Sequence, residues 1–168
     1  MTISMYDLSV PVFTRGLNQL SHVLDKGLAH VKAHDGDPSL LVNARLAPDM
    51  LTLAGQVQRA SDASKLGVAR IGGLTAPPFA DSETSFEDLQ ARIMKTVDYL
   101  ASVDRSAIDG REESPVKIKV GGHEIDFAAQ RYLLQFALPN FFFHVTTAYA
   151  LLRQHGVAIG KRDYLGAV

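Results

Sequence analysis

The chain has 168 residues, of which 46% are hydrophobic and 21% are charged, and its formal net charge is -1. This length suits one domain that buries most of the surface of its unfolded chain, so we expect residues 1–168 to form a single domain. The nearly balanced charge argues against a surface dedicated to nucleic acid, which would need a clustered basic excess.

The composition also limits the chemistry that the chain can perform. Because the sequence contains no cysteine, neither a disulfide framework nor a cysteine nucleophile is available. The N-terminal residues lack the basic region and long apolar stretch of a secretory signal, and no apolar run has transmembrane length. We therefore expect a cytoplasmic protein that binds neither membranes nor nucleic acid.

The first predicted element is one long amphipathic helix. Apolar residues recur at steps of three and four between residues 6 and 31, which keeps one helical face apolar. An interior proline removes a backbone donor and collides with the preceding turn, so Pro11 predicts that the helix begins near it, with Ser9 or Val10 as its cap. The stretch "HDGDPS" at 34–39 predicts the end of this helix.

Two further helices follow. Pro48 predicts the start of the second, because the first turn tolerates proline and Asp49 there suits the helix dipole. Its apolar spacing continues to Ile71, and the paired glycines and prolines of "GGLTAPPF" end it. A third helix lies in "ETSFEDLQARIMKTVDYLASVD", with Ser85 or Thr84 as its cap.

The C-terminal half adds a hairpin and a last helix. Charged and apolar residues alternate between residues 117 and 127 around the glycine pair 121–122, which predicts a short β-hairpin that packs against the helices. Apolar residues in 138–152 then follow helical spacing, and Gly156 is a natural C-terminal cap. We therefore predict an all-α four-helix bundle with a short β-hairpin before the last helix.

The last helix carries a candidate site on its flank. His144 lies about 90° from the centre of the apolar stripe, on the same side as Asn140, which comes one turn earlier. Both side chains can therefore reach one ligand in a groove between helices. The more ordinary interpretation is that His144 completes a packed interior, where Asn140 helps to satisfy its hydrogen bonds.

The other histidines carry weaker signals. His30 and His34 have the spacing that can hold a metal from one helix face, but they occupy a last turn, where histidine suits the helix dipole, and no third ligand accompanies them. His22 is expected on the surface, and His123 and His155 lie at a turn and a helix end. The sequence contains no G-x-S-x-G, H-E-x-x-H, phosphate-loop or dinucleotide-binding motif.

Three stretches together resemble a known family. They are "MYDLSVPVF", "RLAPDMLTLAGQVQRASD" and "QFALPNFFFHVTTAYALLRQHGVAIGKRDYLG", and on them the chain is identified as a member of the domain-of-unknown-function 1993 family. The resemblance covers essentially the whole chain. That family is similar in turn to the DinB/YfiT-like group of four-helix bundles, so the resemblance implies a bundle and often a homodimer.

The resemblance also implies where a site would lie. Members of the wider group frequently hold a divalent metal with one histidine from the second helix and two from an H-x-x-x-H stretch on the last, and some relatives use it in thiol-dependent transfer or isomerisation. Matching a histidine followed nine residues later by arginine places the last ligand at His144 and the arginine at Arg153. The preceding ligand position becomes Asn140, and Gln56 is the expected replacement on the second helix.

One imidazole and two neutral amides form a poor site for zinc or nickel, so we expect neither a metal nor another cofactor. The leading hypothesis is a homodimeric bundle with a small polar cavity lined by Gln56, Asn140 and His144. The first alternative is a metal- or histidine-dependent enzyme, such as a thiol-dependent transferase or isomerase, with His144 as base or ligand. The second is a purely structural dimeric module, in which Phe143 is a candidate subunit contact.

Overall fold

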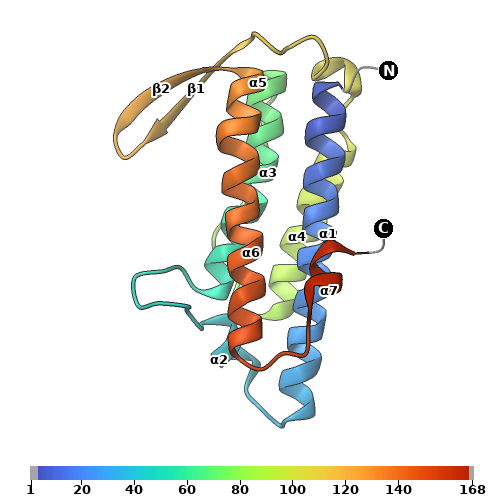
Figure 1. The fold of residues 1–168 in the computed structure, drawn as a ribbon, viewed down its shortest axis with the longest axis vertical. Coiled ribbons are helices and arrows are strands. Elements are labelled where there is room, and N and C mark those ends of the chain that lie inside the picture. Colours follow the sequence, from blue (N-terminus) through green and yellow to red (C-terminus); the bar gives the residue numbers. More distant parts are fainter. Residues whose placement is uncertain (1–3, 167–168) are drawn as a thin grey trace.

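Four long helices pack side by side along the length of the molecule in the computed structural model, which describes residues 4–166 (Figure 1). They are α1 (Met5–Ala33), α3 (Leu53–Gly72), α4 (Phe86–Ala101) and α6 (Leu138–Gln154). Helices α1 and α3 each pack against both α4 and α6, so the order around the bundle is α1–α4–α3–α6. This arrangement confirms the predicted four-helix bundle.

Shorter elements connect the long helices. They are α2 (Pro38–Val42), the 3-10 turn Arg105–Ala107, strands β1 (Pro115–Val120) and β2 (His123–Ala128), α5 (Ala129–Tyr132), the π-helical turn Leu133–Ala137 and α7 (Lys161–Leu165). The two strands project from one end of the bundle, whereas α7 lies against α1 (Figure 1). Within residues 4–166, no helix is both long enough and apolar enough to cross a membrane.

Helix α1 begins earlier than Pro11 predicts. Its cap is Ser4, whose hydroxyl accepts a hydrogen bond from the backbone N–H of Asp7 at 3.3 Å. Pro11 therefore lies inside the helix, and the prediction of Ser9 or Val10 as the cap is wrong. The helix tolerates the proline because Pro11 and Asp7 are both exposed, so water can bind the Asp7 carbonyl that loses its helical partner.

Helix α3 begins at Leu53, so the predicted start at Pro48 is wrong. The Thr52 hydroxyl caps the helix by accepting a backbone N–H of the first turn at 3.0 Å. Thr52 also forms an isolated antiparallel bridge with Arg45, which holds the residues between them as a loop. The first-turn position for proline is instead used by Pro38, which opens the short helix α2.

Helix α4 and the hairpin form as predicted. Ser85 caps α4 and shares a capping box with Asp88. Strand β1 pairs antiparallel with β2, and the glycines 121–122 both take positive φ angles at the turn between them. The hairpin contacts the bundle through Val116 and Ile118 of β1, which are 2% and 5% exposed.

The π-helical turn Leu133–Ala137 joins α5 to α6 in one helical segment, which starts earlier than predicted. Pro139 follows this turn, and a proline lacks a backbone N–H and collides with the carbonyl four residues earlier in a regular helix. The wider turn accommodates that proline, and such turns are frequent at functional sites. After α6, Gly156 has a φ of 83°, which confirms it as the residue that ends the helix.

The core lies between the four long helices, each of which contributes an apolar stripe. Its buried members include Phe13, Leu17, Leu20, Leu24, Val57, Ala60, Val68, Leu89, Ile93, Leu100, Phe141, Val145, Ala148 and Leu152. The ring of Phe141 packs edge-on against Phe13 at a centroid distance of 5.1 Å, and a Cβ at Gly16 would collide with it. Phe142 is half-buried, and Phe143 is 55% exposed.

Candidate functional site

Helices α3 and α6 bring two of the predicted site residues into direct contact. Nδ1 of His144, on α6, lies 2.8 Å from Oε1 of Gln56, on α3. Gln56 is 1% exposed, and its Nε2 donates a hydrogen bond to the carbonyl of Leu51 at 3.3 Å. Both ends of the Gln56 amide are therefore bonded, which fixes this side chain between the two helices.

Gln56 determines which nitrogen of His144 carries the proton. Because an amide oxygen only accepts hydrogen bonds, Nδ1 is the donor, and Nε2 keeps its lone pair in the neutral ring. None of residues 4–166 forms a hydrogen bond with Nε2. Burial, and secondly the positive charge of Arg59, lowers the pKa of His144 from its usual value of 6.5. His144 is therefore neutral at pH 7, with Nε2 available as an acceptor.

Asn140, the third predicted site residue, lies one turn before His144 and faces a cavity of about 180 Å³ between α3 and α6. The lining of this α3–α6 cavity is Arg59, Asp62, Ala63, Leu66, Arg70, Tyr132, Phe136, Ala137 and Asn140. Neither Gln56 nor His144 belongs to it. The groove between these helices thus contains the hydrogen bond between His144 and Gln56 and, separately, a cavity that Asn140 lines.

The two arginines of the α3–α6 cavity have different partners. Arg59 pairs with the carboxylates of Asp62 and Asp81. Arg70 donates from Nη1 to the hydroxyl of Tyr132 at 2.9 Å and forms no ion pair with any carboxylate of residues 4–166. The cavity therefore presents a guanidinium whose charge is not balanced by a partner, and guanidinium groups suit planar anions such as carboxylates.

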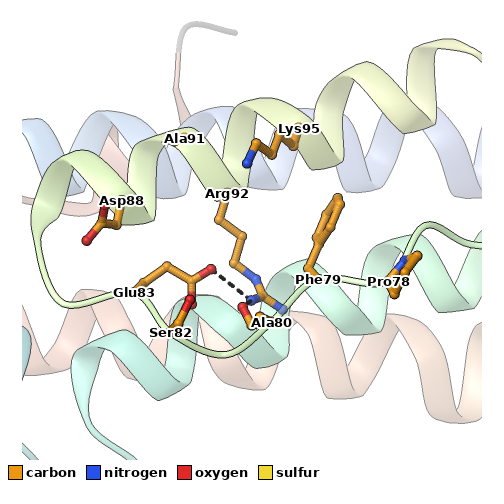
Figure 2. Close-up of a pocket in the computed structure, with 9 residues that line it drawn as sticks. All are labelled: Pro78, Phe79, Ala80, Ser82, Glu83, Asp88, Ala91, Arg92 and Lys95. Atoms are coloured by element: carbon orange, nitrogen blue, oxygen red, sulfur yellow. Dashed lines mark hydrogen bonds and ion pairs between the residues drawn. The ribbon is translucent and has the colours of Figure 1, made fainter.

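A second polar cluster, between α3 and α4, was not predicted from the sequence. Arg92, on α4, is 2% exposed and lies 2.9 Å from carboxylate oxygens of Asp62 on α3 and of Glu83 on the connecting loop. Lys65 also pairs with Asp62, at 3.1 Å. Figure 2 shows Arg92 extending from α4 towards Glu83. These two side chains line a cavity of about 290 Å³. Because these charges are paired within the chain, the cluster holds the loop onto the bundle.

The remaining histidines lie away from the groove between α3 and α6. His30, His34 and His155 line one cavity of about 250 Å³ where α1 and α6 end. His22 lies 3.2 Å from a carboxylate oxygen of α7, and His123 is exposed at the start of β2. In the described part of the chain, no three His, Asp or Glu side chains stand close enough together to hold a metal ion as they are.

These features define a DinB-like four-helix bundle with a polar groove between α3 and α6. The chain belongs to the DUF1993 family, a domain of unknown function whose family model matches residues 5–165. It is similar to the crystal structure of a DinB family member protein from Shewanella denitrificans, with 38% sequence identity and a TM-score of 0.88 over 97% of this chain and 92% of that chain. No curated protein matches the chain. The predicted family and fold are therefore confirmed.

The divalent metal that the wider group implies does not fit the residues at Gln56, Asn140 and His144. Zinc and nickel favour imidazole, thiolate and carboxylate donors, whereas one imidazole stands here with two neutral amides. The amide oxygen of Gln56 is already bonded to Nδ1 of His144, and Asn140 faces the α3–α6 cavity. The positive charge of Arg59 is the second cause, after burial, of the lowered pKa of His144. The same charge disfavours a cation at this position.

Proposed function

We propose that this chain is a metal-independent binding protein whose α3–α6 cavity holds a small organic carboxylate. Arg70 and the hydroxyl of Tyr132 bind the carboxylate group, and the apolar part of the ligand lies on Leu66 and Phe136. Asn140 supplies a further hydrogen bond. The observation that carries this proposal is the exposed guanidinium of Arg70, which has no carboxylate partner within residues 4–166 and lies in one cavity with the apolar side chains of Leu66 and Phe136.

The backbone of the helical segment 129–154 supports this proposal. Phe136 and Ala137 belong to the π-helical turn Leu133–Ala137, and both line the cavity. A π-helical turn contains more residues than a regular turn, so the side chains around it depart from regular helix packing. The cavity thus lies where the helix is irregular, while the hydrogen bond between Gln56 and His144 holds α3 and α6 together beside it.

Benzoate is a suitable probe, because it joins a carboxylate to an apolar ring. Isothermal titration of the wild-type chain is expected to detect benzoate binding, and benzyl alcohol, which lacks the charge, is expected to bind more weakly. Arg70→Gln is expected to weaken benzoate binding about tenfold or more, since a hydrogen bond to a charged group contributes about 1.5–3 kcal/mol.

The matched control is Arg131→Gln, which removes the same charge from an exposed position of α5 that does not line the cavity. This variant is expected to bind benzoate as the wild type does. Equal losses in the two variants would mean that only the net charge matters. That result, or a wild-type chain that does not distinguish benzoate from benzyl alcohol, contradicts the proposal.

We further propose that the chain forms a homodimer through the exposed surface of α6 around Phe143. The ring of Phe143 is 55% exposed and packs edge-on against His144 at a centroid distance of 5.2 Å. Light scattering is expected to give the mass of two chains for the wild type and of one chain for Phe143→Ser. Met94→Ser is the control, because Met94 is 60% exposed on α4. A monomeric wild type would contradict this proposal.

One observation favours a second candidate function, a histidine-dependent enzyme. Gln56 fixes Nδ1–H of His144 and leaves Nε2 with its lone pair, which is the arrangement of an oriented general base. Diethyl pyrocarbonate modifies unprotonated imidazoles, so peptide mass spectrometry can measure whether His144 reacts in the folded chain. A reactive His144 supports this candidate. If His144 is inert in a sample in which the exposed His123 reacts, the candidate is contradicted.

A further inference from the structure

Helices α1, α6 and α7 together line a cavity of about 280 Å³. This α1–α6–α7 cavity shares no lining residue with the α3–α6 cavity, so a ligand of one site does not need the other. We propose that the α1–α6–α7 cavity binds a medium-chain aliphatic carboxylate, whose hydrocarbon chain lies in the cavity and whose carboxylate group binds Arg15.

The walls of the α1–α6–α7 cavity are mainly apolar. Aliphatic side chains come from each of the three helices, and two aromatic rings complete the walls: Val12, Val145 and Leu165, with Phe142 and Tyr164. The side chain of Leu165 is 43% exposed, so a hydrocarbon chain that covers it is stabilised by the burial of apolar surface. The volume lies just below the range of roughly 300–1,000 Å³ that is usual for ligand pockets, which favours a small ligand.

Arg15 gives this apolar cavity a positive charge. Among the lining residues within 4–166 it is the only charged one, whereas the α3–α6 cavity also contains the carboxylate of Asp62. Nη2 of Arg15 donates to the carbonyl oxygen of Leu165 at 2.8 Å, and the guanidinium forms no ion pair with a carboxylate of residues 4–166. Because a guanidinium has five N–H groups, Arg15 keeps donors for a carboxylate, and the amide of Gln19 adds another.

Contacts of α7 hold the cavity wall in place. The helix lies against α1 (Figure 1). The carboxylate of Asp163 pairs with Nζ of Lys26, on α1, at 2.7 Å. The hydroxyl of Tyr164 lies 2.9 Å from that of Thr146, on α6. Since α7 is bonded to both long helices, the cavity exists before a ligand arrives, and binding does not have to order the wall.

The test is an NMR titration of the full-length chain with labelled valine and leucine methyl groups. The probes are butanoate, hexanoate and octanoate, each below the concentration at which it forms micelles. We expect saturable shifts of the methyl signals of Val12, Val145 and Leu165. The affinity measured from these signals is expected to rise about threefold for each added methylene group, because each one buries apolar surface. Wild-type signals that do not saturate, or an affinity independent of chain length, would overturn the proposal.

Arg15→Gln tests the carboxylate contact. It is expected to weaken octanoate binding about fivefold, a modest factor because Arg15 is exposed and water screens the pair. The affinity for uncharged 1-octanol is expected to stay the same in this variant. Arg131→Gln, which removes an exposed charge from α5, and Arg70→Gln, in the α3–α6 cavity, are both expected to bind octanoate at this site as the wild type does. An equal loss in Arg15→Gln and Arg131→Gln contradicts a specific contact.

Tyr164→Phe separates binding by Arg15 from its contact with α7. This variant removes the hydrogen bond to Thr146 but keeps the ring and the charge, so its octanoate affinity is expected to stay near that of the wild type. If it loses as much affinity as Arg15→Gln, Arg15 acts only by holding α7, and the proposal fails.

Leu165→Ser tests the apolar wall, because it removes a lining side chain and keeps the backbone carbonyl that Arg15 binds. It is expected to lower the octanoate affinity about threefold or more. The matched control is Leu134→Ser, since Leu134 is 45% exposed, against 43% for Leu165, and does not line the cavity. Equal affinities of these two variants would show that the chain does not lie on α7, which overturns the proposal.

Discussion

Helix α3 meets α4 and α6 through polar groups on both sides, but the charges on the two sides are paired to different degrees. Towards α4, the buried guanidinium of Arg92 is bonded to carboxylates of Asp62 and Glu83. Towards α6, Nε2 of His144 and the charge of Arg70 have no partner among residues 4–166. The Nε–H of Arg92 is itself buried without a partner within residues 4–166, so the two sides differ in how their charges are paired. Paired ions contribute to a rigid fold, whereas an unpaired charge or a free acceptor is available to a ligand.

The two sides of α3 also differ in charge. Burial alone would raise the pKa of Glu83, but the hydrogen bonds from Arg92 and Gln58 outweigh it, so the pKa is lowered. Glu83 therefore stays ionised and paired at neutral pH. His144 has the opposite tendency, because burial and then the charge of Arg59 favour its neutral form. The side towards α4 is a network of paired ions, and the side towards α6 centres on a neutral histidine.

The largest expected effect is on the side towards α4. Arg92→Met keeps much of the side-chain volume but leaves Asp62, Asp81 and Glu83 without the cation that they share. We expect the free energy of unfolding, measured with urea, to fall by about 3 kcal/mol. This value is at the low end of the range for broken buried ion pairs, because the side chains of Asp62 and Asp81 are 22% and 44% exposed and can bind water.

Lys95→Met is the control for this prediction. Lys95 follows Arg92 by three residues on α4, but it is exposed, so its replacement is expected to change the unfolding free energy by less than about 0.5 kcal/mol. If both variants lose the same stability, the paired ions do not hold the loop before α4, and the contrast between the two sides of α3 is lost.

The fold could be predicted from the sequence where apolar periodicity is strong. The stripes of α4 and α6 predict these helices because burial of one face is the main source of helix stability in proteins. The starts of α1 and α3 could not be predicted in this way. Pro11 and Pro48 are both compatible with a first turn, and the choice depends on the caps Ser4 and Thr52 and on a backbone bridge to Arg45.

The polar contacts of α3 were less accessible to prediction. Gln56 was placed near His144 through the family resemblance, since their contact depends on the relative rotation of two helices that are far apart in the sequence. The same comparison grouped Asn140 with them, but Asn140 faces the α3–α6 cavity, which neither of the other two lines. The ion cluster around Arg92 left no comparable signal, because a charged residue on a helix is usually exposed.

A smaller effect is expected from the hydrogen bond between Gln56 and His144. Gln56→Met keeps a side chain of similar size but leaves Nδ1 of His144 without its acceptor, so we expect a loss of about 1–2 kcal/mol in unfolding free energy. A double-mutant cycle with His144→Ala is expected to give a coupling of about 1 kcal/mol. The matched cycle of Gln56→Met with Asn140→Ala should give a coupling near zero, and equal couplings would contradict the observed pairing.

The smallest expected effect is a dependence of stability on pH below 6.5, which His144 produces on the side towards α6. The lowered pKa of Glu83, on the side towards α4, acts only at more acidic pH. The pKa of His144 is lower in the folded chain than its usual value of 6.5, because of burial first and then the charge of Arg59. Between these two pKa values the unfolded chain binds more protons than the folded chain, so acidification favours unfolding. The contribution of neutral His144 to stability is thus present above pH 6.5 and is lost as the pH falls through the folded pKa.

Urea unfolding of the wild type and of His144→Ala across this pH range isolates that contribution. The difference in unfolding free energy between the two proteins is expected to shrink as the pH falls below 6.5, and an NMR titration of the His144 ring should give its folded pKa directly. Arg59→Gln should move that pKa upward, because it removes the second cause of the shift. A folded pKa at or above 6.5 would mean that the fold does not favour the neutral form of His144, and the contrast between the two sides of α3 would not hold.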